Sequence, residues 1–186
     1  IAPTAPARRS KRPTAPALNT ILPFTRNVIG PMDYTPLALS PSTHPRKTTL
    51  GHELALTVLF ESGIVHLVEK PSAINQLPFA TKVLLKYLPS RWDQTKFLLG
   101  WPGKDVIIAR QSKALWYVAG INGEGKEKKR KLDLRSLGTG LFEIEYHKDD
   151  LAIGKLTTEF IKVQSVTPID IVLPPYGGFL LKIRKP

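Results

Sequence analysis

Few residues in this chain have both the type and the spacing that chemistry requires. The four histidines, His44, His52, His66 and His147, lack the spacing of metal ligands, and the absence of cysteine excludes thiolate ligands and disulfides. No glycine-rich phosphate loop, no GxSxG motif and no HExxH motif occurs. The sequence therefore predicts no metal-ligating residue and no catalytic nucleophile of these kinds.

Asp33 is the acidic residue with the most suggestive position. Pro31 and Pro36 bracket it, and a residue before proline is disfavoured in helical conformation, so the segment should be extended. It leads into a loop rich in Ser, Pro and Thr at 40–47 and then into an apolar helix. This layout is typical of the C-terminal end of a (β/α)8 barrel strand, where such enzymes carry their sites. Two interpretations stay open for Asp33, a role in a cleft and a purely structural role.

The other polar and aromatic candidates have simpler interpretations. His52 and Glu53 are predicted to be polar groups near the N-terminus of the apolar helix, and Glu61 a solvent-facing or paired carboxylate. Trp116 should pack in a core because it lies inside a predicted strand, whereas Trp101, between Gly and Pro, could be exposed and stack on a sugar ring.

The helix that follows Asp33 is predicted over 52–69 and is apolar on nearly all sides. Its polar residues, Glu53, Thr57 and Glu61, form only a narrow stripe at a spacing of four. Such a helix needs protein around it. Without other partners we expect it to expose apolar side chains such as Leu54, Phe60 or Val65, unless it docks on the sandwich.

A shorter helix is predicted within 71–91, with Pro78 in its first turn, and after Trp92 the hydrophobic period changes to two. Seven short strands are predicted, at 105–110, 115–120, 129–134, 141–147, 158–166, 169–173 and 179–184. This number and spacing indicate an antiparallel β-sandwich. The residues expected to fill its interior are Trp116, Tyr117, Phe142, Ile144 and Phe160.

Composition limits the class of protein further. The chain has 186 residues, of which 42% are hydrophobic, so it can bury a core and is not globally disordered. The net charge of +12 includes two basic runs, at 8–12 and 126–131. Neither run is interleaved with aromatic residues, so both are interpreted as solvated and not as nucleic-acid contacts. No apolar stretch is long enough for a membrane helix.

The start of the chain is unusual. Residues 1–18 are rich in Ala, Pro, Thr and Arg without an apolar period, and are expected to be irregular or disordered. Residue 1 is Ile, with no initiator Met and no apolar leader, so the sequence predicts a fragment of a longer protein and no signal peptide.

Several motifs resemble glycoside hydrolase family 97. Residues 19–26 (NTILPFTR) and 30–36 (GPMDYTP) are similar to the last part of the catalytic barrel of that family, and 52–63 to its closing helix. Residues 92–96 (WDQTK) and 116–123 (WYVAGING) resemble its linker and its C-terminal β-sandwich. The resemblance covers about residues 19–186.

The resemblance implies an α-glycoside hydrolase of the α-glucosidase or α-galactosidase type, with a bound calcium ion and an α-linked oligosaccharide or glycoside as its partner. It implies no nucleic acid, no membrane, and a periplasmic or secreted location. Inverting members use glutamates as general acid and base, which also hold calcium, and retaining members use a carboxylate nucleophile. Both mechanisms need two carboxyl groups that flank the glycosidic bond.

This sequence departs from the family at the catalytic position. The family carries a Glu-His pair directly before the Asn-Thr of the barrel motif, whereas this chain has Ala17-Leu18, and residues 1–18 contain no acid. We therefore expect no catalytic residue, no glycosidase activity and no calcium site in this chain alone. The residues that the resemblance places on the substrate side are Asn19, Arg26, Asp33 and Tyr34.

The predicted organisation is an α+β fragment with three parts. An irregular tail at 1–18 precedes a remnant of a (β/α)8 barrel at 19–91, which contributes two helices, and an antiparallel β-sandwich at 92–186. Two other functions stay open. The sandwich could be a non-catalytic carbohydrate-binding or scaffold module, which an exposed aromatic pair on a flat sheet face would favour. A nucleic-acid binder, suggested by charge alone, would need a continuous basic face without acids.

Overall fold

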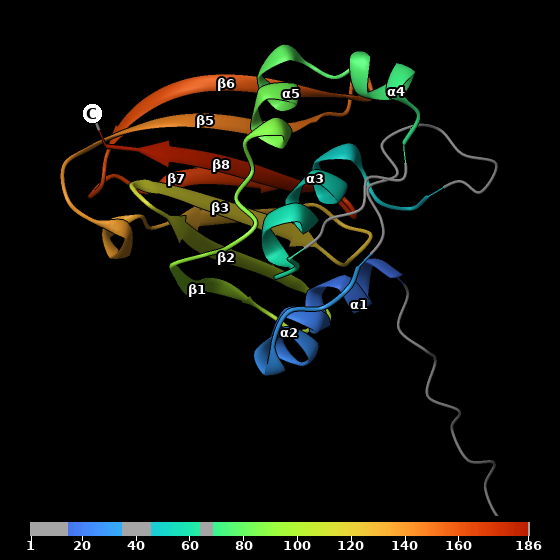
Figure 1. Cartoon of the computed structure of the whole chain (residues 1–186), viewed down its shortest axis with the longest axis horizontal. Coiled ribbons are helices and arrows are strands. Elements are labelled where there is room, and N and C mark those ends of the chain that lie inside the picture. Colours follow the sequence, from blue (N-terminus) through green and yellow to red (C-terminus); the bar gives the residue numbers. More distant parts are fainter. Residues whose placement is uncertain (1–14, 35–45, 64–68, 186) are drawn as a thin grey trace, which may run out of the picture.

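Short helices come first along the chain and strands follow (Figure 1). The computed structural model describes residues 15–34, 46–63 and 69–185. The helical segments are α1 (Ala15–Ile21), the 3-10 turn η1 (Leu22–Phe24), α2 (Arg26–Ile29), α3 (Leu50–Leu59), α4 (Pro71–Asn75) and α5 (Phe79–Lys86). Among the described residues, no helix is both long and apolar enough to span a bilayer.

The strands form two antiparallel sheets. The larger sheet has the order β1-β2-β3-β8-β5-β6, and the smaller one pairs β4 with β7. The strands are β1 (Gln94–Trp101), β2 (Asp105–Ser112), β3 (Leu115–Asn122), β4 (Lys128–Leu132), β5 (Leu141–Asp150), β6 (Lys155–Gln164), β7 (Ile169–Leu173) and β8 (Gly178–Arg184), with a 3-10 turn, η2 (Arg135–Leu137), before β5. The few helices and the antiparallel sandwich agree with the sequence prediction.

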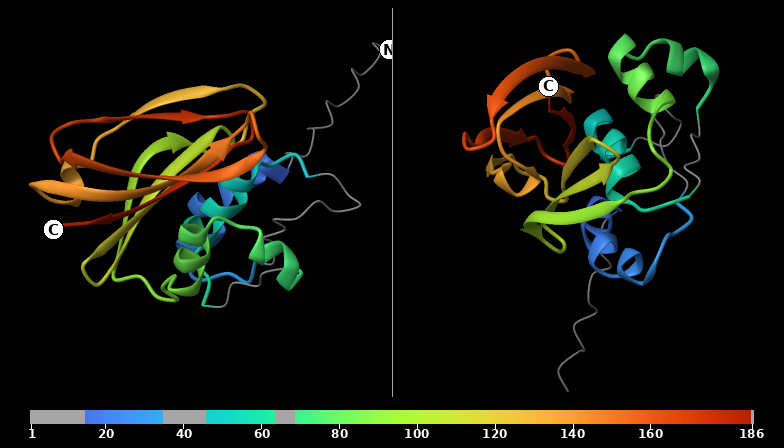
Figure 2. Two further views of the ribbon diagram at one scale, coloured as in Figure 1. Left: turned by 90° about the horizontal axis from the view of Figure 1, so that it is seen from above. Right: turned by 60° about the vertical axis from the view of Figure 1, so that its left-hand side comes forward.

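Alternation along the strands creates two separate cores. On the inner face of the large sheet, Phe142, Ile144 and Phe179 pack against β4 and β7, as the period of two requires. On the outer face, residues such as Ala119 and Leu180 pack against helix α3 and its neighbours. Helices α1 to α5 gather on this outer side (Figure 2). The large sheet is therefore covered on both faces over part of its area.

Two of the predicted interior residues lie elsewhere. Trp116, Phe142 and Ile144 fill the layer between the sheets, but Tyr117 points to the outer face and packs in the helical core. Phe160 is 75% exposed on β6, so its predicted burial is wrong. The prediction assumed that only one face of the sheet is buried, whereas helix α3 supplies a second apolar partner for strand β3.

Helix α3 is shorter than predicted and is well covered. It ends at Leu59 because Phe60 adopts an extended conformation, so the prediction of a helix through residue 69 is wrong; residues 64–68 lie outside the described part. Leu54 and Phe60 are buried, at 0% and 2% exposed, and Val65 is among the residues not described. Of the two alternatives left open for this helix, exposure or docking on the sandwich, the structure shows docking.

The region 71–91 contains two short helices instead of one. Pro78 stands directly before α5 as its N-cap residue, and because proline disfavours helical conformation in the residue before it, α4 and α5 are separate. At the start of the chain, α1 begins at Ala15, so the expected irregular tail is wrong from that residue onward; residues 1–14 are not described.

An additional edge strand, β1, was not predicted. It pairs with β2, and its register shifts between Phe97 and Leu99, which marks a β-bulge. A bulge breaks the period of two, and this is why the alternation is not visible in the sequence. Strands β2, β3, β5 and β8 are also longer than predicted, and β4 and β6 are displaced toward the N-terminus.

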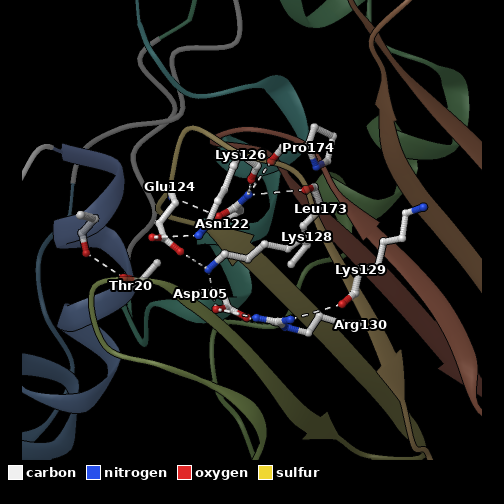
Figure 3. A network of polar contacts seen from close by, with 11 residues as sticks. Thr20, Asp105, Asn122, Glu124, Lys126, Lys128, Lys129, Arg130, Leu173 and Pro174 are labelled. Atoms are coloured by element: carbon white, nitrogen blue, oxygen red, sulfur yellow. Dashed lines mark hydrogen bonds and ion pairs between the residues drawn. The ribbon is translucent and has the colours of Figure 1, made fainter.

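The basic run at 126–131 is not entirely solvated, contrary to the prediction. Lys128 is 7% exposed, and its ammonium lies 2.7 Å from both Asp105 and Glu124 (Figure 3). Arg130 pairs with the same Asp105 at 2.8 Å, whereas Lys129 and Lys131 are exposed. The network joins β2 to β4, and its hydrogen bonds hold the pKa of Asp105 below its usual value in spite of burial. The other basic run, at 8–12, lies outside the described residues.

Candidate functional site

Two of the four predicted substrate-side residues meet in a buried polar cluster. The amide nitrogen of Asn19 lies 3.0 Å from Nε2 of His52, and the hydroxyl of Tyr34 donates to the amide oxygen of Asn19 at 3.0 Å. Asn19 and His52 are 6% and 0% exposed. The cluster joins α1, α3 and the segment after Gly30, three pieces that are distant in sequence. The interpretation of His52 as a polar group near a helix N-terminus is confirmed, but its partner was not predicted.

Burial determines the protonation of this cluster. It lowers the pKa of His52 to about 4, so the ring is neutral at pH 7. Because Nε2 accepts a hydrogen bond from the Asn19 amide, the ring proton is assigned to Nδ1. The backbone of Tyr176 and Gly177 lies near the ring, but among the described residues Nδ1 has no hydrogen-bond partner of good geometry. Burial, with a smaller contribution from the negative charge of Glu53, raises the pKa of Tyr34 to about 12.

Glu53 is the carboxylate nearest to this cluster. It is 6% exposed, and the hydroxyl of Thr48 donates to it at 2.5 Å. Burial raises its pKa above the usual value. A single buried carboxyl group of this kind can donate or accept a proton, but glycoside hydrolysis needs a second one on the other side of the bond.

The other two predicted residues, Arg26 and Asp33, lie apart from the cluster. Both side chains are exposed, and a guanidinium nitrogen of Arg26 is 3.4 Å from the carbonyl oxygen of Gly30. Asp33 follows the buried Met32, whose amide donates to the carbonyl oxygen of Glu61 at 2.9 Å. The structure therefore brings Asn19 and Tyr34 together and leaves Arg26 and Asp33 at the surface.

The N-terminus of helix α3 is held by an acid from strand β5. A carboxylate oxygen of Asp149 accepts from the backbone amide of Gly51 at 2.7 Å and another from the hydroxyl of Thr49 at 2.5 Å. Thr49 is also the N-cap residue and accepts from the amide of His52. A negative charge here satisfies free amide groups and complements the helix dipole. Burial nevertheless raises the pKa of Asp149.

The C-terminus of the same helix is held by an arginine from strand β2. Arg110 is 3% exposed and donates to the carbonyl oxygen of Leu59 at 3.1 Å, to Thr95 at 2.9 Å and to Glu61 at 3.2 Å. A cation at this end complements the dipole in the same way. The interpretation of Glu61 as a paired carboxylate is confirmed. Sequence reasoning missed both Asp149 and Arg110, because no local signal connects them to a helix so far away in sequence.

The contact between α3 and the sandwich leaves no room for a side chain at two points. A β-carbon at Gly51 would collide with the carbonyl oxygen of Gly178, and one at Gly178 would approach the backbone of His52. Close packing also places α1 against the turn at Gly123. The buried cluster of Asn19, Tyr34 and His52 is thus built directly on the end of the sandwich.

A metal would need several oxygen or nitrogen ligands in one place. Within the described residues, no group of three His, Asp or Glu side chains is arranged to hold an ion. Glu53 is accompanied by hydroxyl groups and not by further carboxylates, which does not match the oxygen-rich shell of calcium.

Comparison with known proteins identifies the family of the sandwich. Residues 91–184 match the family model described as "Glycosyl-hydrolase 97 C-terminal, oligomerisation". Two relatives share the sequence over longer segments. A probable retaining alpha-galactosidase of Streptomyces bingchenggensis is 40% identical over 126 residues, which are 68% of this chain and 19% of the relative. A retaining alpha-galactosidase of Bacteroides thetaiotaomicron is 28% identical over 180 residues, 89% of this chain and 27% of the relative.

Solved structures with the same fold extend the match beyond the sandwich. A beta-arabinopyranosidase superposes with a TM-score of 0.79 at 28% identity, over 89% of this chain and 27% of that one. A glycoside hydrolase family 97 enzyme of Pseudoalteromonas sp. strain K8, solved in complex with panose, superposes with a TM-score of 0.80 at 25% identity, over 91% and 28% of the two chains.

The β-sandwich and its docked helical segment together correspond to about a quarter of the length of these two solved chains. The chain belongs to glycoside hydrolase family 97. It spans 19% and 27% of the length of the two alpha-galactosidase relatives, so most of their sequence has no counterpart here.

Proposed function

We propose that this chain is part of an α-glycoside hydrolase of the α-galactosidase type. In that enzyme the sandwich would hold the last elements of the catalytic barrel in place. The observation that carries the proposal is the attachment of α3 at both of its ends, through Asp149 and Arg110. An accessory domain that only accompanied a barrel would not need to supply both caps of a buried helix. The names of the two alpha-galactosidase relatives support the choice of substrate.

In this proposal, residues 19–91 are the remnant of a (β/α)8 barrel and residues 92–186 are the C-terminal domain. Helix α3 would be the closing helix of the barrel. The exposed apolar side chains of Val28 and Ile29 on α2, at 73% and 86%, support this assignment, since apolar surface of this kind normally has a protein partner.

Asn19 and Tyr34 would then shape the substrate side of the site, with Arg26 and Asp33 at its rim. The hydrogen bonds to His52 fix the Asn19 amide, and Asn19 in turn fixes the Tyr34 hydroxyl. Such positioning is useful where sugar hydroxyls must be bound in one orientation. These residues would bind and orient a terminal α-galactoside, and would not transfer protons to it.

The proton transfers of hydrolysis need a pair of carboxyl groups that this chain does not supply in the segment 15–34. Asp33 is the single acid there, and Ala17 stands where the family carries its glutamate. One carboxyl group must protonate the leaving oxygen while the other attacks the anomeric carbon or activates water. We therefore propose that the chain alone is inactive. No calcium chemistry is assigned to it, because the described residues lack a suitable set of ligands.

A chimera tests the proposed role. The matched C-terminal region of the Bacteroides thetaiotaomicron relative is replaced by this chain from Asn19 onward, so that the relative supplies its own barrel up to that point. We expect the chimera to hydrolyse 4-nitrophenyl α-galactoside. Replacing both Asp149 and Arg110 by Ala in the chimera should abolish that activity, whereas Asp170→Asn, at an exposed position of β7, should not. A folded chimera with no activity would contradict the proposal.

A further inference from the structure

The outer face of the large sheet changes character along its strands. Toward one end, the cross-strand rows beneath α3 are apolar, for example Ala119 beside Leu180. Toward the other end, beyond the helices, the rows become charged. Glu143 lies between its cross-strand neighbours Lys162 and Arg184, and Glu145 lies between Phe160 and Lys182. The part of this face that the helices leave uncovered therefore carries charged side chains. It is not an apolar surface from which a protein partner is missing.

These two charged rows line an open pocket of about 430 Å³ on β5, β6 and β8, strands that lie side by side in Figure 1. Its volume is within the range of sites for small ligands. The lining residues are Leu115, Glu143, Ile144, Glu145, Phe160, Ile161, Lys162, Lys182 and Arg184.

The charges in the pocket are paired with one another. Glu143 contacts Lys162 at 2.7 Å and Arg184 at 2.6 Å, and these hydrogen bonds lower its pKa. Glu145 contacts Lys182 at 3.3 Å through one oxygen and Nε2 of the buried His147 at 3.0 Å through the other. With two carboxylates and three cations, the pocket has a formal charge of +1. Pairing of this kind leaves little net field to attract a strongly charged ligand, but it leaves carboxylate lone pairs and N–H groups available to hydroxyls.

Phe160 adds an apolar element to this polar surface. Its side chain stands on the same face as Glu145 and is 75% exposed. A pyranose ring has one face of C–H groups and a rim of hydroxyls, so it can pack on an aromatic ring while neighbouring groups bind its rim. The combination of a phenyl ring with fixed donors and acceptors matches a neutral sugar better than a phosphate or a cation.

We propose that this pocket binds a neutral saccharide of one or two pyranose rings, with Phe160 as the stacking surface and Glu143, Glu145, Lys182 and Arg184 as hydrogen-bonding groups. The site is separate from the cluster of Asn19 and Tyr34 and would hold a saccharide without cleaving it. The choice of a galactoside as the probe rests on the proposed function.

Titration of the whole chain with melibiose, an α-galactosyl disaccharide, tests the proposal by calorimetry or by NMR shifts. We expect binding in the millimolar range, and Phe160→Ala should weaken it about tenfold or more. The matched control is Trp101→Ala, because Trp101 is 67% exposed but lies on β1 at the opposite edge of the sheet. Unchanged affinity in Phe160→Ala, or its loss in Trp101→Ala, would overturn the assignment.

A second variant distinguishes saccharide binding from self-association of the chain through the same surface. Glu143→Gln keeps the shape of the side chain but weakens its bonds to Lys162 and Arg184, so melibiose affinity should fall while the mass in solution stays the same. The mass of the chain and of Phe160→Ala is measured by light scattering. If the Phe160 variant changes the oligomeric state and melibiose does not bind, the surface serves self-association, and the saccharide proposal is wrong.

Discussion

His52 shows how one buried side chain can couple the stability of this chain to pH. Its ring is enclosed between α1, α3 and the Tyr176–Gly177 turn, where a positive charge would have neither water nor a counterion next to it. The same burial that keeps the ring neutral makes it an acceptor for Asn19, so its hydrogen bond depends on its protonation state. The cluster should therefore weaken in mild acid.

We predict a loss of stability between pH 6.5 and pH 4 that is due to His52. The pKa of the ring is lowered from 6.5 to about 4, so the unfolded chain binds a proton in this window that the folded chain does not. The contribution of His52 is complete above pH 6.5 and falls by up to about 3 kcal/mol as pH decreases to 4. Urea unfolding of the chain and of His52→Gln at several pH values measures the difference, since Glu53 and Asp149 titrate in both. Parallel curves for the two proteins would refute the prediction.

Arg110 is predicted to matter far more than an ordinary surface arginine. Arg110→Met removes three hydrogen bonds and leaves the carbonyl oxygen of Leu59 without its donor, which should cost about 3 kcal/mol of unfolding free energy. The control is Arg135→Ala, whose partner Asp133 is also exposed, so that its loss should leave the free energy of unfolding almost unchanged. Denaturant unfolding compares the two. Equal effects would mean that Arg110 is not a structural anchor.

At the scale of elements, helix α3 depends on the sandwich for both of its ends. Ten residues form a helix that would be marginal in isolation, because nucleation is costly and few hydrogen bonds follow it. The structure compensates with the Asp149 and Arg110 contacts and with burial of almost the entire circumference. At Leu59, where the helix ends, the Arg110 guanidinium donates to a carbonyl oxygen that no longer has a partner within the helix.

Removing the acid at the N-terminus tests this dependence. Asp149→Ala should destabilise the chain by about 1–2 kcal/mol, through the lost hydrogen bonds to Thr49 and Gly51 and the lost dipole interaction. Asp170→Asn, on an exposed position of β7, serves as the control and should change little. Thermal unfolding followed by circular dichroism reports both. A shift no larger than that of the control would show that the amides at this end find other partners.

The sequence predicted correctly those elements whose burial follows from a local pattern. The predictions were wrong where residues distant in sequence determine which side chains are buried. The alternation of Phe142 and Ile144 with charged neighbours identified β5 and its inner face, because one face of that strand meets apolar residues and the other is wet. Tyr117 was assigned to the wrong face, because the apolar residues that cover it come from segments before the predicted sandwich strands. One of them is Trp92, whose ring lies 5.4 Å from that of Tyr117. In the cluster, Asn19 and Tyr34 were selected by resemblance to a family, but the hydrogen bonds that join Asn19 to Tyr34 and to His52 depend on packing that no spacing encodes.

At the scale of the whole molecule, the proposed function assigns substrate binding to this chain and proton transfer to residues outside it. Asp33 is the single acid among residues 15–34, so that segment supplies no pair of carboxyl groups. We predict no turnover of 4-nitrophenyl α-galactoside or α-glucoside by the purified chain at any pH between 4 and 8, within the limit set by a blank without protein. Activity that follows the protein through a second purification step would contradict this and would require an acid pair elsewhere in the chain.

The attachment of α3 also has a consequence for the order of events during synthesis. Asp149 follows Gly51 by 98 residues, and Gly178, which packs against the same helix end, comes later still. A ribosome delivers the helical segment long before these contacts exist. Residues 50–59 therefore leave the ribosome before the strands of the sandwich that cover them, and an apolar segment that is exposed during this interval favours aggregation.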